Sequence, residues 1–381
     1  MIIAVLYMCT TLAVPFRILF MPVNQKSHVS CTFEIGRALS RRGHESHFIL
    51  SDGYSIDSKM ADQAKEANIS LFKYVRTRTN MGETMEEIVE QFAANMITSK
   101  ASFADMHNMS VFWTPLLAME LLQENEPLVE KLHSAGFDMA VIDSTFGSKQ
   151  FYMLAHRLGI PWISYTDYPN AWTMKVPWLP SFVPGQFSSQ TEKMNFLGRI
   201  WNALISIIVV LKEKAVPIPQ TIINEYQKYG AFNSVEELVA KSKFWLLTRD
   251  ATLDYAKPLM PHMTDVGGLT TEPAKKLPGD IQSFLDGAED GVIVVSFGSM
   301  LSRFPDILLK KFLEAFNRIE RHRIIWRLSN VSSEFQIPDF IRPVRWLPQN
   351  DILAHPKVKL FITHSGNNGQ FEALYHGVTY F

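Results

Sequence analysis

The sequence predicts an α/β protein with two doubly wound domains, each built on a parallel sheet. Apolar runs of strand length alternate with amphipathic helical segments in residues 17–50, and the same alternation returns in residues 291–377. Such alternation is typical of a parallel sheet with helices on both faces. Between the two stretches, residues 257–280 contain four prolines and three glycines, which indicates a linker. A length of 381 residues allows two or three domains.

The first domain is expected over residues 16–245. Its strands are predicted at the buried apolar runs, which lie at Arg17–Val23, Glu45–Leu50, Phe137–Asp143, after Pro161, and at Lys243–Thr248. Residues 29–44 have helical spacing, with Gly43 as the expected stop. A second helix is predicted at residues 148–160, and residues 82–136 have a mostly helical pattern. The Trp- and Pro-rich residues 168–187 predict a long irregular loop, which often carries function.

The second domain is expected over residues 281–381, after an interdomain linker region at 246–280. Strands are predicted at Gly291–Ser299, His322–Leu328, Val344–Pro348 and Val358–His364. Helices are predicted at Pro305–Ile319, Asn350–Pro356 and Gly369–Gly377. Strand and helix alternate again, so this part is also expected to be doubly wound.

Charge and cysteine content exclude several classes of protein. The formal net charge is −1, so charge alone implies neither nucleic acid nor an anionic membrane as a partner. Only Cys9 and Cys31 are present, and these permit one disulfide at most. No His/Cys cluster has the spacing of a metal site, so we expect no metal.

Two apolar stretches bear on localisation. Residues 1–15 are expected to be a signal peptide, although a buried first strand or a misplaced start codon would also fit. Three sequons, at Asn68, Asn108 and Asn330, are compatible with a luminal chain. No apolar run approaches about 20 residues, so no membrane span is predicted. Residues 203–211 are expected to be a buried helix, or else a helix lying in a membrane interface beside Trp201.

The stretch "FITHSGNNGQFEALYHG", residues 361–377, indicates a candidate nucleotide site. A buried strand ends at His364, turns through small residues including Gly366, and enters a helix whose free N–H groups attract anions. His364 and Asn368 can donate to phosphate oxygens, and Glu372 can accept from ribose hydroxyls. A plain strand–turn–helix with a capping Asn remains the alternative.

Two further strand ends are expected to converge on the same place, because ligands sit at the carboxyl ends of strands in an open sheet. "VSFGS" ends with Ser299 in a small, open turn. "RWLPQNDIL" places Trp346 at a strand end, with Gln349 three residues later. An indole there can stack on a nucleobase and an amide can read its edge, although Trp346 could equally be a core residue.

Residues 346–377, "WLPQNDILAHPKVKLFITHSGNNGQFEALYHG", resemble the signature of the UDP-glycosyltransferases, closest to the UDP-glucuronosyltransferase type of animals. "VVSFGSM", "VGGL" and "RRGH" support the resemblance, which extends from about Phe16 to the end. It implies two Rossmann-like domains in the GT-B architecture. The N-terminal domain would bind a small lipophilic acceptor, and the C-terminal domain a UDP-sugar, UDP-glucuronate or UDP-glucose, with no other cofactor.

The resemblance also implies individual roles in the nucleotide site. Trp346 would stack on uracil, and Gln349 would contact the base or ribose. Ser299, His364 and Asn368 would contact the diphosphate, Gly366 would let it approach, and Glu372 would hold ribose hydroxyls. One departure is visible: the family usually has Gly where this chain has Ser365.

Sugar transfer to a hydroxyl needs a base near the acceptor, and histidine suits that work near neutral pH. His28 follows the first strand, and Asp143 ends the strand at 137–143, so both lie at carboxyl ends. From the residues alone, the chain's other histidines compete for this role. The resemblance implies that His28 is the base and Asp143 its partner, in one in-line displacement with inversion. A nicotinamide dehydrogenase is disfavoured, because no G-x-G-x-x-G follows the first strand.

The resemblance finally implies that the chain is truncated at its C-terminus, with an incomplete second domain. The family normally continues to an Asp-Gln pair that grips the sugar and to a membrane anchor, both absent from this sequence. We expect a chain in the lumen of the endoplasmic reticulum that is associated with the membrane. We also expect it to pair with itself or with related transferases. The alternative is a weak or inactive form that binds UDP and modulates full-length partners.

Overall fold

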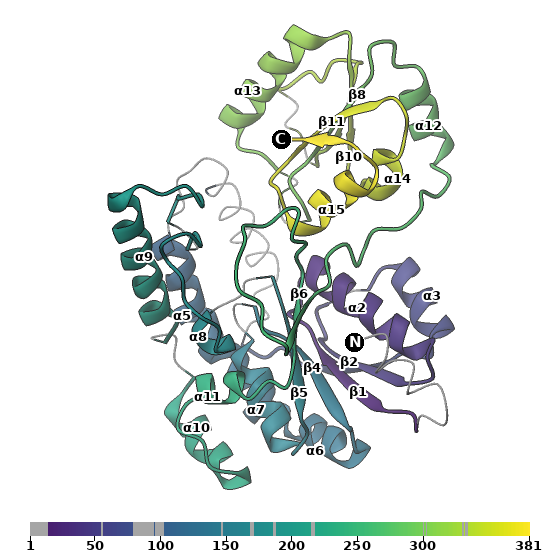
Figure 1. Cartoon of the computed structure of the whole chain (residues 1–381). Helices are drawn as coiled ribbons and strands as arrows, with labels where there is room; N and C mark the ends of the chain where they lie inside the picture. The colour runs from purple at the N-terminus through teal and green to yellow at the C-terminus, as the bar shows by residue number, and fades with distance from the viewer. Residues whose placement is uncertain are drawn as a thin grey trace. The chain divides into compact units, whose positions relative to one another are not determined.

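A computed structural model describes residues 14–54, 56–78, 95, 103–145, 148–167, 171–185, 188–214, 218–299, 301, 303–329, 331 and 334–381 (Figure 1). The expected signal peptide lies almost wholly outside these residues. The chain divides into two compact units. The first contains the described residues up to Arg78, within 107–247, and at 251–265; the second is built mainly from residues 266–381.

The first unit is built on a seven-stranded parallel sheet in the order β3-β2-β1-β4-β5-β6-β7. Its strands are β1 (Arg17–Met21), β2 (Glu45–Ser51), β3 (Ser70–Tyr74), β4 (Met139–Asp143), β5 (Trp162–Thr166), β6 (Trp245–Leu247) and β7 (Met263–Asp265). From β1, the chain adds β2 and then β3 on one side, and it then returns to the other side of β1 with β4. The strand order therefore reverses between the neighbouring strands β1 and β4, which is the topological switch point of this sheet.

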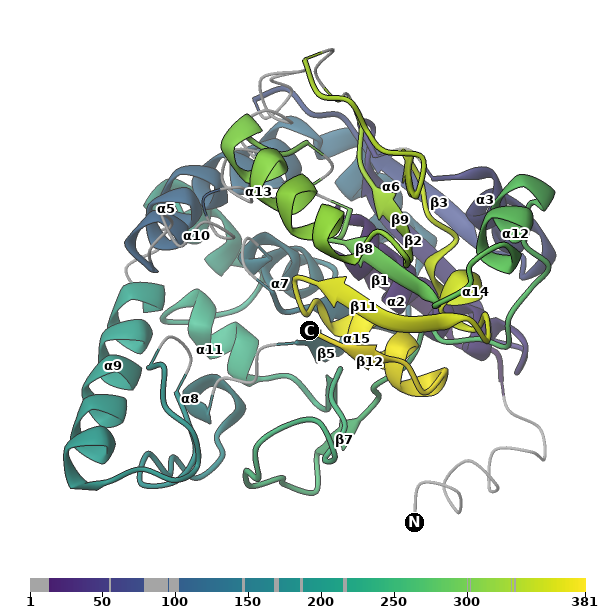
Figure 2. The same ribbon diagram turned by 90° about the horizontal axis from the view of Figure 1, so that it is seen from above.

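Helices follow most of these strands. They are α2 (Lys26–Ser40), α3 (Ser58–Glu66), α5 (Phe103–Met119), the π-helix η1 (Glu120–Glu124), α6 (Glu126–Ala135), α7 (Lys149–Arg157), α8 (Ala171–Met174), α9 (Phe196–Lys214), α10 (Gln220–Tyr226), the 3-10 helix η2 (Gln227–Tyr229) and α11 (Val235–Ala240). In both views α9 lies at the periphery of its unit (Figures 1 and 2).

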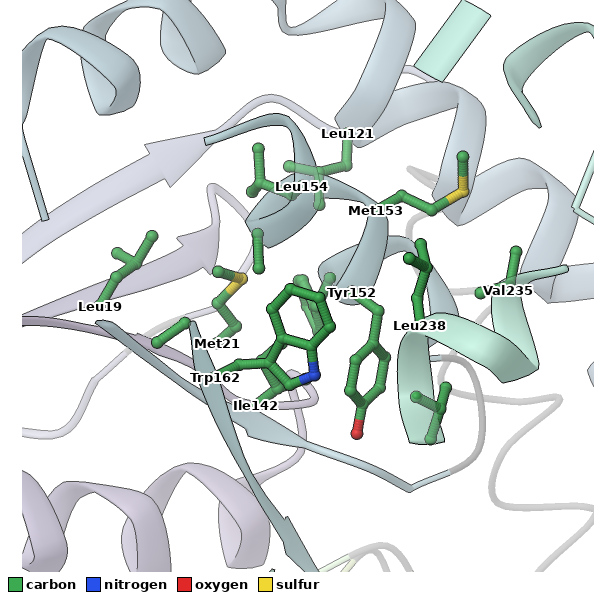
Figure 3. Packing of buried hydrophobic residues seen from close by; sticks show 14 of the residues in the cluster. Leu19, Met21, Leu121, Ile142, Tyr152, Met153, Leu154, Trp162, Val235 and Leu238 are labelled. Carbon is green, nitrogen blue, oxygen red and sulfur yellow. The ribbon is translucent and has the colours of Figure 1, made fainter. Parts of the chain in front are cut away.

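Both faces of the first sheet are covered, which explains why its strands are continuous apolar runs. On one face, Leu19, Met21 and Ile142 of the strands pack with Tyr152 to Leu154 of α7 and Leu238 of α11 (Figure 3). On the other face, Phe20 and Phe48 stack with ring centroids 4.6 Å apart. This packing fixes where β1 and β4 end, and so where the residues beyond them lie.

The second unit holds a five-stranded parallel sheet in the order β10-β9-β8-β11-β12. Its strands are β8 (Val292–Ser296), β9 (Arg323–Arg327), β10 (Ile341–Val344), β11 (Val358–Thr363) and β12 (Thr379–Tyr380). Its helices are α12 (Gly279–Asp286), α13 (Asp306–Phe316), the 3-10 helix η3 (Asn317–Ile319), α14 (Gln349–Leu353) and α15 (Asn367–Tyr375). The switch point here lies between β8 and β11.

Trp326 is the centre of one face of the second sheet. It is fully buried, and the rings of Phe304, Phe312 and Phe316 surround it at centroid distances of 5.2 to 5.4 Å. Its neighbour Ile325 points into a separate cluster on the opposite face. This alternation holds β9 between two apolar layers, as expected for a central parallel strand.

Two sequence expectations differ from the structure in detail. The strand predicted at Val344–Pro348 lies instead at Ile341–Val344, where it pairs with β9. It is an edge strand, so it tolerates Pro343, and the chain leaves the sheet before Trp346. In addition, the predicted linker region contains β7, which pairs with β6 of the first sheet. None of the helices in the described ranges is long and apolar enough to cross a membrane.

Candidate functional sites

His28 and Asp143 lie together at the switch point of the first sheet. Asp143 is the last residue of β4, and His28 lies in the first turn of α2, which follows β1. The Nδ1 atom of His28 is 2.8 Å from Oδ2 of Asp143, and both side chains are buried. The structure thus joins two residues that the sequence places 115 positions apart.

The carboxylate of Asp143 accepts hydrogen bonds at both oxygens. The backbone N–H of Val23 donates to Oδ2 at 3.2 Å, beside His28. The backbone N–H of Thr145 donates to Oδ1 at 3.1 Å, and the Thr145 hydroxyl donates to the same oxygen. Burial alone would raise the pKa of Asp143, but the charge of His28 and these donors hold that pKa below its ordinary value. Asp143 is therefore an ionised, fully buried carboxylate.

The same pairing acts on His28 in the opposite direction. Burial alone would lower the pKa of the imidazole, but the negative charge and hydrogen bond of Asp143 outweigh it, with a smaller contribution from Asp167. Together these effects raise the pKa of His28 to about 9. Because an ionised carboxylate can only accept, Nδ1 carries a proton, and Nε2 is the nitrogen left to exchange protons with another molecule. Thr145, which sequence reasoning missed, completes this arrangement.

The second candidate site lies at the switch point of the second sheet. Gly298 follows β8, and His364 follows the adjacent strand β11. The imidazole of His364 lies against the backbone of Gly298 and of Gly366: a Cβ added to Gly298 would come within 2.7 Å of the ring, and one added to Gly366 would overlap it. The two glycines therefore leave the space that the His364 ring occupies.

His364 and the start of α15 supply hydrogen-bond donors at this place. Gly366 is the N-cap of α15, and Asn367 and Asn368 are its first two residues. Partial burial lowers the pKa of His364, so the ring is neutral at pH 7 and has one N–H to donate. Free N–H groups at a helix N-terminus, together with the helix dipole, favour an anion. Ser365, between His364 and Gly366, has a φ of 56°, a conformation that favours glycine.

Gln349 and Glu372 form a second part of this site. Gln349 is the first residue of α14, and its Nε2 donates to Oε2 of Glu372 on α15 at 2.6 Å. Gly369 permits this approach, because a Cβ there would lie 3.3 Å from the Gln349 amide nitrogen. Two of the predicted nucleotide residues therefore hold one another in place.

Trp346 is 54% exposed, so it is not a core residue. The guanidinium carbon of Arg327, the last residue of β9, lies 5.9 Å from its ring centroid. Arg327 also donates to the backbone carbonyls of Ser299 and Leu301, each at 3.2 Å, and to that of Gly298. Sequence reasoning missed Arg327. Its position at the carboxyl end of a predicted strand was the available signal.

Arg327 therefore connects Trp346 with the loop that carries Ser299, two parts of the site that the sequence predicts only separately. It holds the loop after β8, which carries the exposed Ser299, and it supports the face of Trp346 by a cation–π contact. Around this centre, the second unit offers an exposed indole face for stacking and a set of donors for an anion. Such a combination suits a nucleotide with a charged phosphate group.

Two parallel, doubly wound sheets define the GT-B class of glycosyltransferase, as predicted. UGT2 of Phytolacca americana, complexed with UDP-2fluoro-glucose and pterostilbene, matches with a TM-score of 0.58 at 17% identity, over 97% of this chain and 80% of that one. The calicheamicin glycosyltransferase CalG4 matches with a TM-score of 0.57 at 18% identity, over 96% and 79%. At these identities the likeness concerns the fold.

The sequence profile of the UDP-glucoronosyl and UDP-glucosyl transferase family matches residues 17–380, and the chain belongs to this family. This confirms the resemblance found in the sequence. The rat (Rattus norvegicus) 2-hydroxyacylsphingosine 1-beta-galactosyltransferase is 28% identical over 94% of this chain. UDP-glucuronosyltransferase 3A1 of Xenopus laevis is 28% identical over 92% of it. The chain spans about two thirds of the length of these relatives, 64% and 67% respectively.

Proposed function

We propose that this chain transfers a sugar from a UDP-sugar to a hydroxyl group of a small lipophilic acceptor, with inversion at the anomeric carbon. The observation that carries the proposal is the buried pair of His28 and Asp143, with Nδ1 and Oδ2 2.8 Å apart at the switch point of the first sheet. Family membership supports the donor class, because the family is that of UDP-glucoronosyl and UDP-glucosyl transferases.

In this proposal, His28 acts in its neutral form, which becomes populated as the pH rises towards its pKa of about 9. Nε2 of that form takes the proton of the acceptor hydroxyl as the hydroxyl oxygen forms a bond to the anomeric carbon. The bond from that carbon to the diphosphate oxygen breaks, and UDP leaves with the electron pair. Asp143 keeps Nδ1 protonated and stabilises the imidazolium that results. His364, Asn368 and the N-terminus of α15 would stabilise the charge that develops on the leaving diphosphate.

The other site residues would bind the donor. Trp346, supported by Arg327, would stack on the uracil, and Gln349 would contact the base or ribose. Glu372 would accept from the ribose hydroxyls, and Ser299 and Gly366 would line the diphosphate. For the sugar, UDP-glucuronate and UDP-glucose are proposed. Among the relatives, the galactosyl and glucuronosyl transferases named above differ in sugar, so the proposal extends no further than UDP-hexoses and UDP-hexuronates as a class.

The test separates binding from chemistry. UDP affinity is measured by isothermal titration calorimetry, and turnover by release of UDP from each UDP-sugar in the presence of a simple phenol. His28→Ala should reduce turnover by about 10²-fold or more while the UDP dissociation constant stays unchanged. His133→Ala, which removes an exposed histidine of α6, serves as the matched control and should leave both unchanged.

Two results would count against the proposal in different ways. Undiminished transfer by a folded His28→Ala variant would remove His28 from the role of base. A Trp346→Ala variant that binds UDP as tightly as the native chain would remove the second unit's site.

We further propose that the chain enters the endoplasmic reticulum. A shift in mass of the expressed chain after treatment with an N-glycosidase would show that a sequon, at Asn68, Asn108 or Asn330, had been glycosylated.

A further inference from the structure

Helix α9 has an exposed face made almost entirely of large apolar side chains. Eight of them are between 41 and 75% exposed: Phe196, Leu197, Ile200, Trp201, Leu204, Ile207, Ile208 and Leu211. Single exposed apolar residues are normal on a protein surface, but a continuous set on one element marks an interaction surface. The expectation that residues 203–211 form a buried helix is therefore wrong for this face.

The eight residues form one stripe along the helix. At about 100° per residue they fall within a sector about 140° wide, with members in every turn. The 19 residues of α9 extend over about 28 Å. The stripe runs from Phe196 to Leu211, over most of the helix, and both views place α9 at the periphery of its unit (Figures 1 and 2).

The opposite face of α9 is fixed to the protein. Asn202 is fully buried, and its amide donates to the carbonyls of Pro180 and Val183 at 2.8 and 2.9 Å. Its side-chain oxygen accepts from the backbone N–H of Gly185 at 2.7 Å. Phe182, which lies between Pro180 and Val183 in the sequence, is 42% exposed. Because the inner face is held by these contacts, the apolar stripe is the outer face, and packing against the described residues of the unit does not explain it.

The charges around the stripe indicate what it contacts. Residues 192–214 contain four basic residues, Lys193, Arg199, Lys212 and Lys214, and two acidic residues, Glu192 and Glu213. By the same helical angle, Arg199 falls beyond one margin of the stripe and Lys212 beyond the other. Burial and, to a smaller extent, the charge of Lys212 lower the pKa of His107 on α5. An apolar face with Trp and Phe between basic margins matches acyl chains below anionic headgroups.

We propose that α9 lies in the interfacial region of an anionic lipid bilayer, with its outer face among the acyl chains and its basic margins at the headgroups. The helix would lie along the surface rather than span the membrane. This contact is independent of sugar transfer. It would hold the first unit at the surface where lipophilic acceptors partition.

The test measures binding of the 381-residue chain to vesicles by co-sedimentation, with phosphatidylcholine alone and with 30% phosphatidylserine as probes. The double variant Leu204→Asn/Ile208→Asn should weaken binding by about 10-fold or more, because two apolar side chains no longer leave water. Ile307→Asn is the control: it changes an exposed isoleucine on α13, away from the stripe, and should bind as the native chain does. Lys193→Gln/Arg199→Gln should lose affinity only for vesicles that contain phosphatidylserine.

Circular dichroism and thermal unfolding check that every variant is folded. Equal vesicle binding by the native chain and the Leu204→Asn/Ile208→Asn variant would assign membrane contact to another part of the chain and overturn the proposal. Absence of vesicle binding, with dimers in sedimentation velocity that the same variant abolishes, would assign the face to a second copy instead, and would also overturn it. Neither outcome alters UDP binding, so the proposed function is tested separately.

Discussion

Asp143 gives His28 both its orientation and its unusual pKa. The carboxylate has four donors around it, of which one is His28 itself, and no water is needed to satisfy it. A pair of this kind is costly to bury and strongly destabilising to break, since either partner alone would be an uncompensated charge. The pair therefore links the proposed chemistry to folding stability, and both can be followed by titration.

The first prediction concerns pH. The pKa of His28 is raised from 6.5 to about 9, so its contribution to the free energy of unfolding is complete below pH 6.5 and is lost as the pH rises through 9. In the Asp143→Asn variant, burial is no longer opposed by this charge, and the pKa of His28 should fall below 6.5. Titration of the His28 Hε1 resonance by NMR measures both values. A value near 9 in the variant would show that another group raises it.

The second prediction concerns Thr145. Thr145→Val removes the hydroxyl that donates to Oδ1 of Asp143 and keeps the size of the side chain. Loss of a hydrogen bond to a buried carboxylate should lower the free energy of unfolding by about 1 to 3 kcal/mol. Thr145→Ser keeps the hydroxyl and should cost less. Denaturant unfolding measures both, and a loss for Val no larger than the loss for Ser would show that the hydroxyl contributes no more to stability than the methyl group.

At the scale of elements, the turn between β11 and α15 is the most constrained segment of the nucleotide site. Within three residues it places the His364 ring against two glycines, passes through Ser365 in the left-handed region, and starts a helix at Gly366. The family's usual Gly at position 365 fits this conformation without strain. The Ser found here is therefore a local cost within an otherwise matching motif.

The third prediction follows from that strain. Ser365→Gly should raise the free energy of unfolding by up to about 1 kcal/mol, because glycine adopts a φ of 56° without the Cβ clash. Ser365→Ala keeps the Cβ and should give no such gain. Both are measured by denaturant unfolding. A gain of the same size from Ala would show that the hydroxyl, and not the backbone conformation, is responsible.

At the scale of the whole molecule, the two units have separate sheets and separate cores. Every proposed UDP contact comes from the second unit, while His28 and Asp143 belong to the first. Binding of a ligand to the native state suppresses opening of the part that holds it. UDP binding and the pair of His28 and Asp143 can therefore be followed independently in one chain.

The fourth prediction uses this division. UDP at 100 times its dissociation constant should stabilise the folded second unit by about 2.7 kcal/mol. Hydrogen exchange followed by mass spectrometry should then slow in peptides that cover residues 297–301, 345–353 and 364–376, and stay unchanged in peptides that cover α2 and β4. Equal protection of α2 would contradict the assignment of UDP to the second unit alone.

The local pattern of the sequence determined much of this protein. Continuous apolar runs predicted the central strands of both sheets, because parallel strands are buried on both faces. The motif at residues 346–377 identified the family and the candidate nucleotide residues, and strand ends placed His28 and Asp143 at the correct edge. These signals are short-range, so they survive in a single chain without knowledge of its packing.

Only the tertiary structure decided the rest. It paired His28 with Asp143 and added Thr145, and it brought Arg327 of β9 to Trp346 and to the loop at Ser299. It also showed that α9 buries Asn202 and exposes its apolar stripe, the reverse of what hydrophobicity predicts. The order of the strands and the choice of the buried helix face depend on contacts between residues far apart in the sequence. The periodicity within one segment does not predict such contacts.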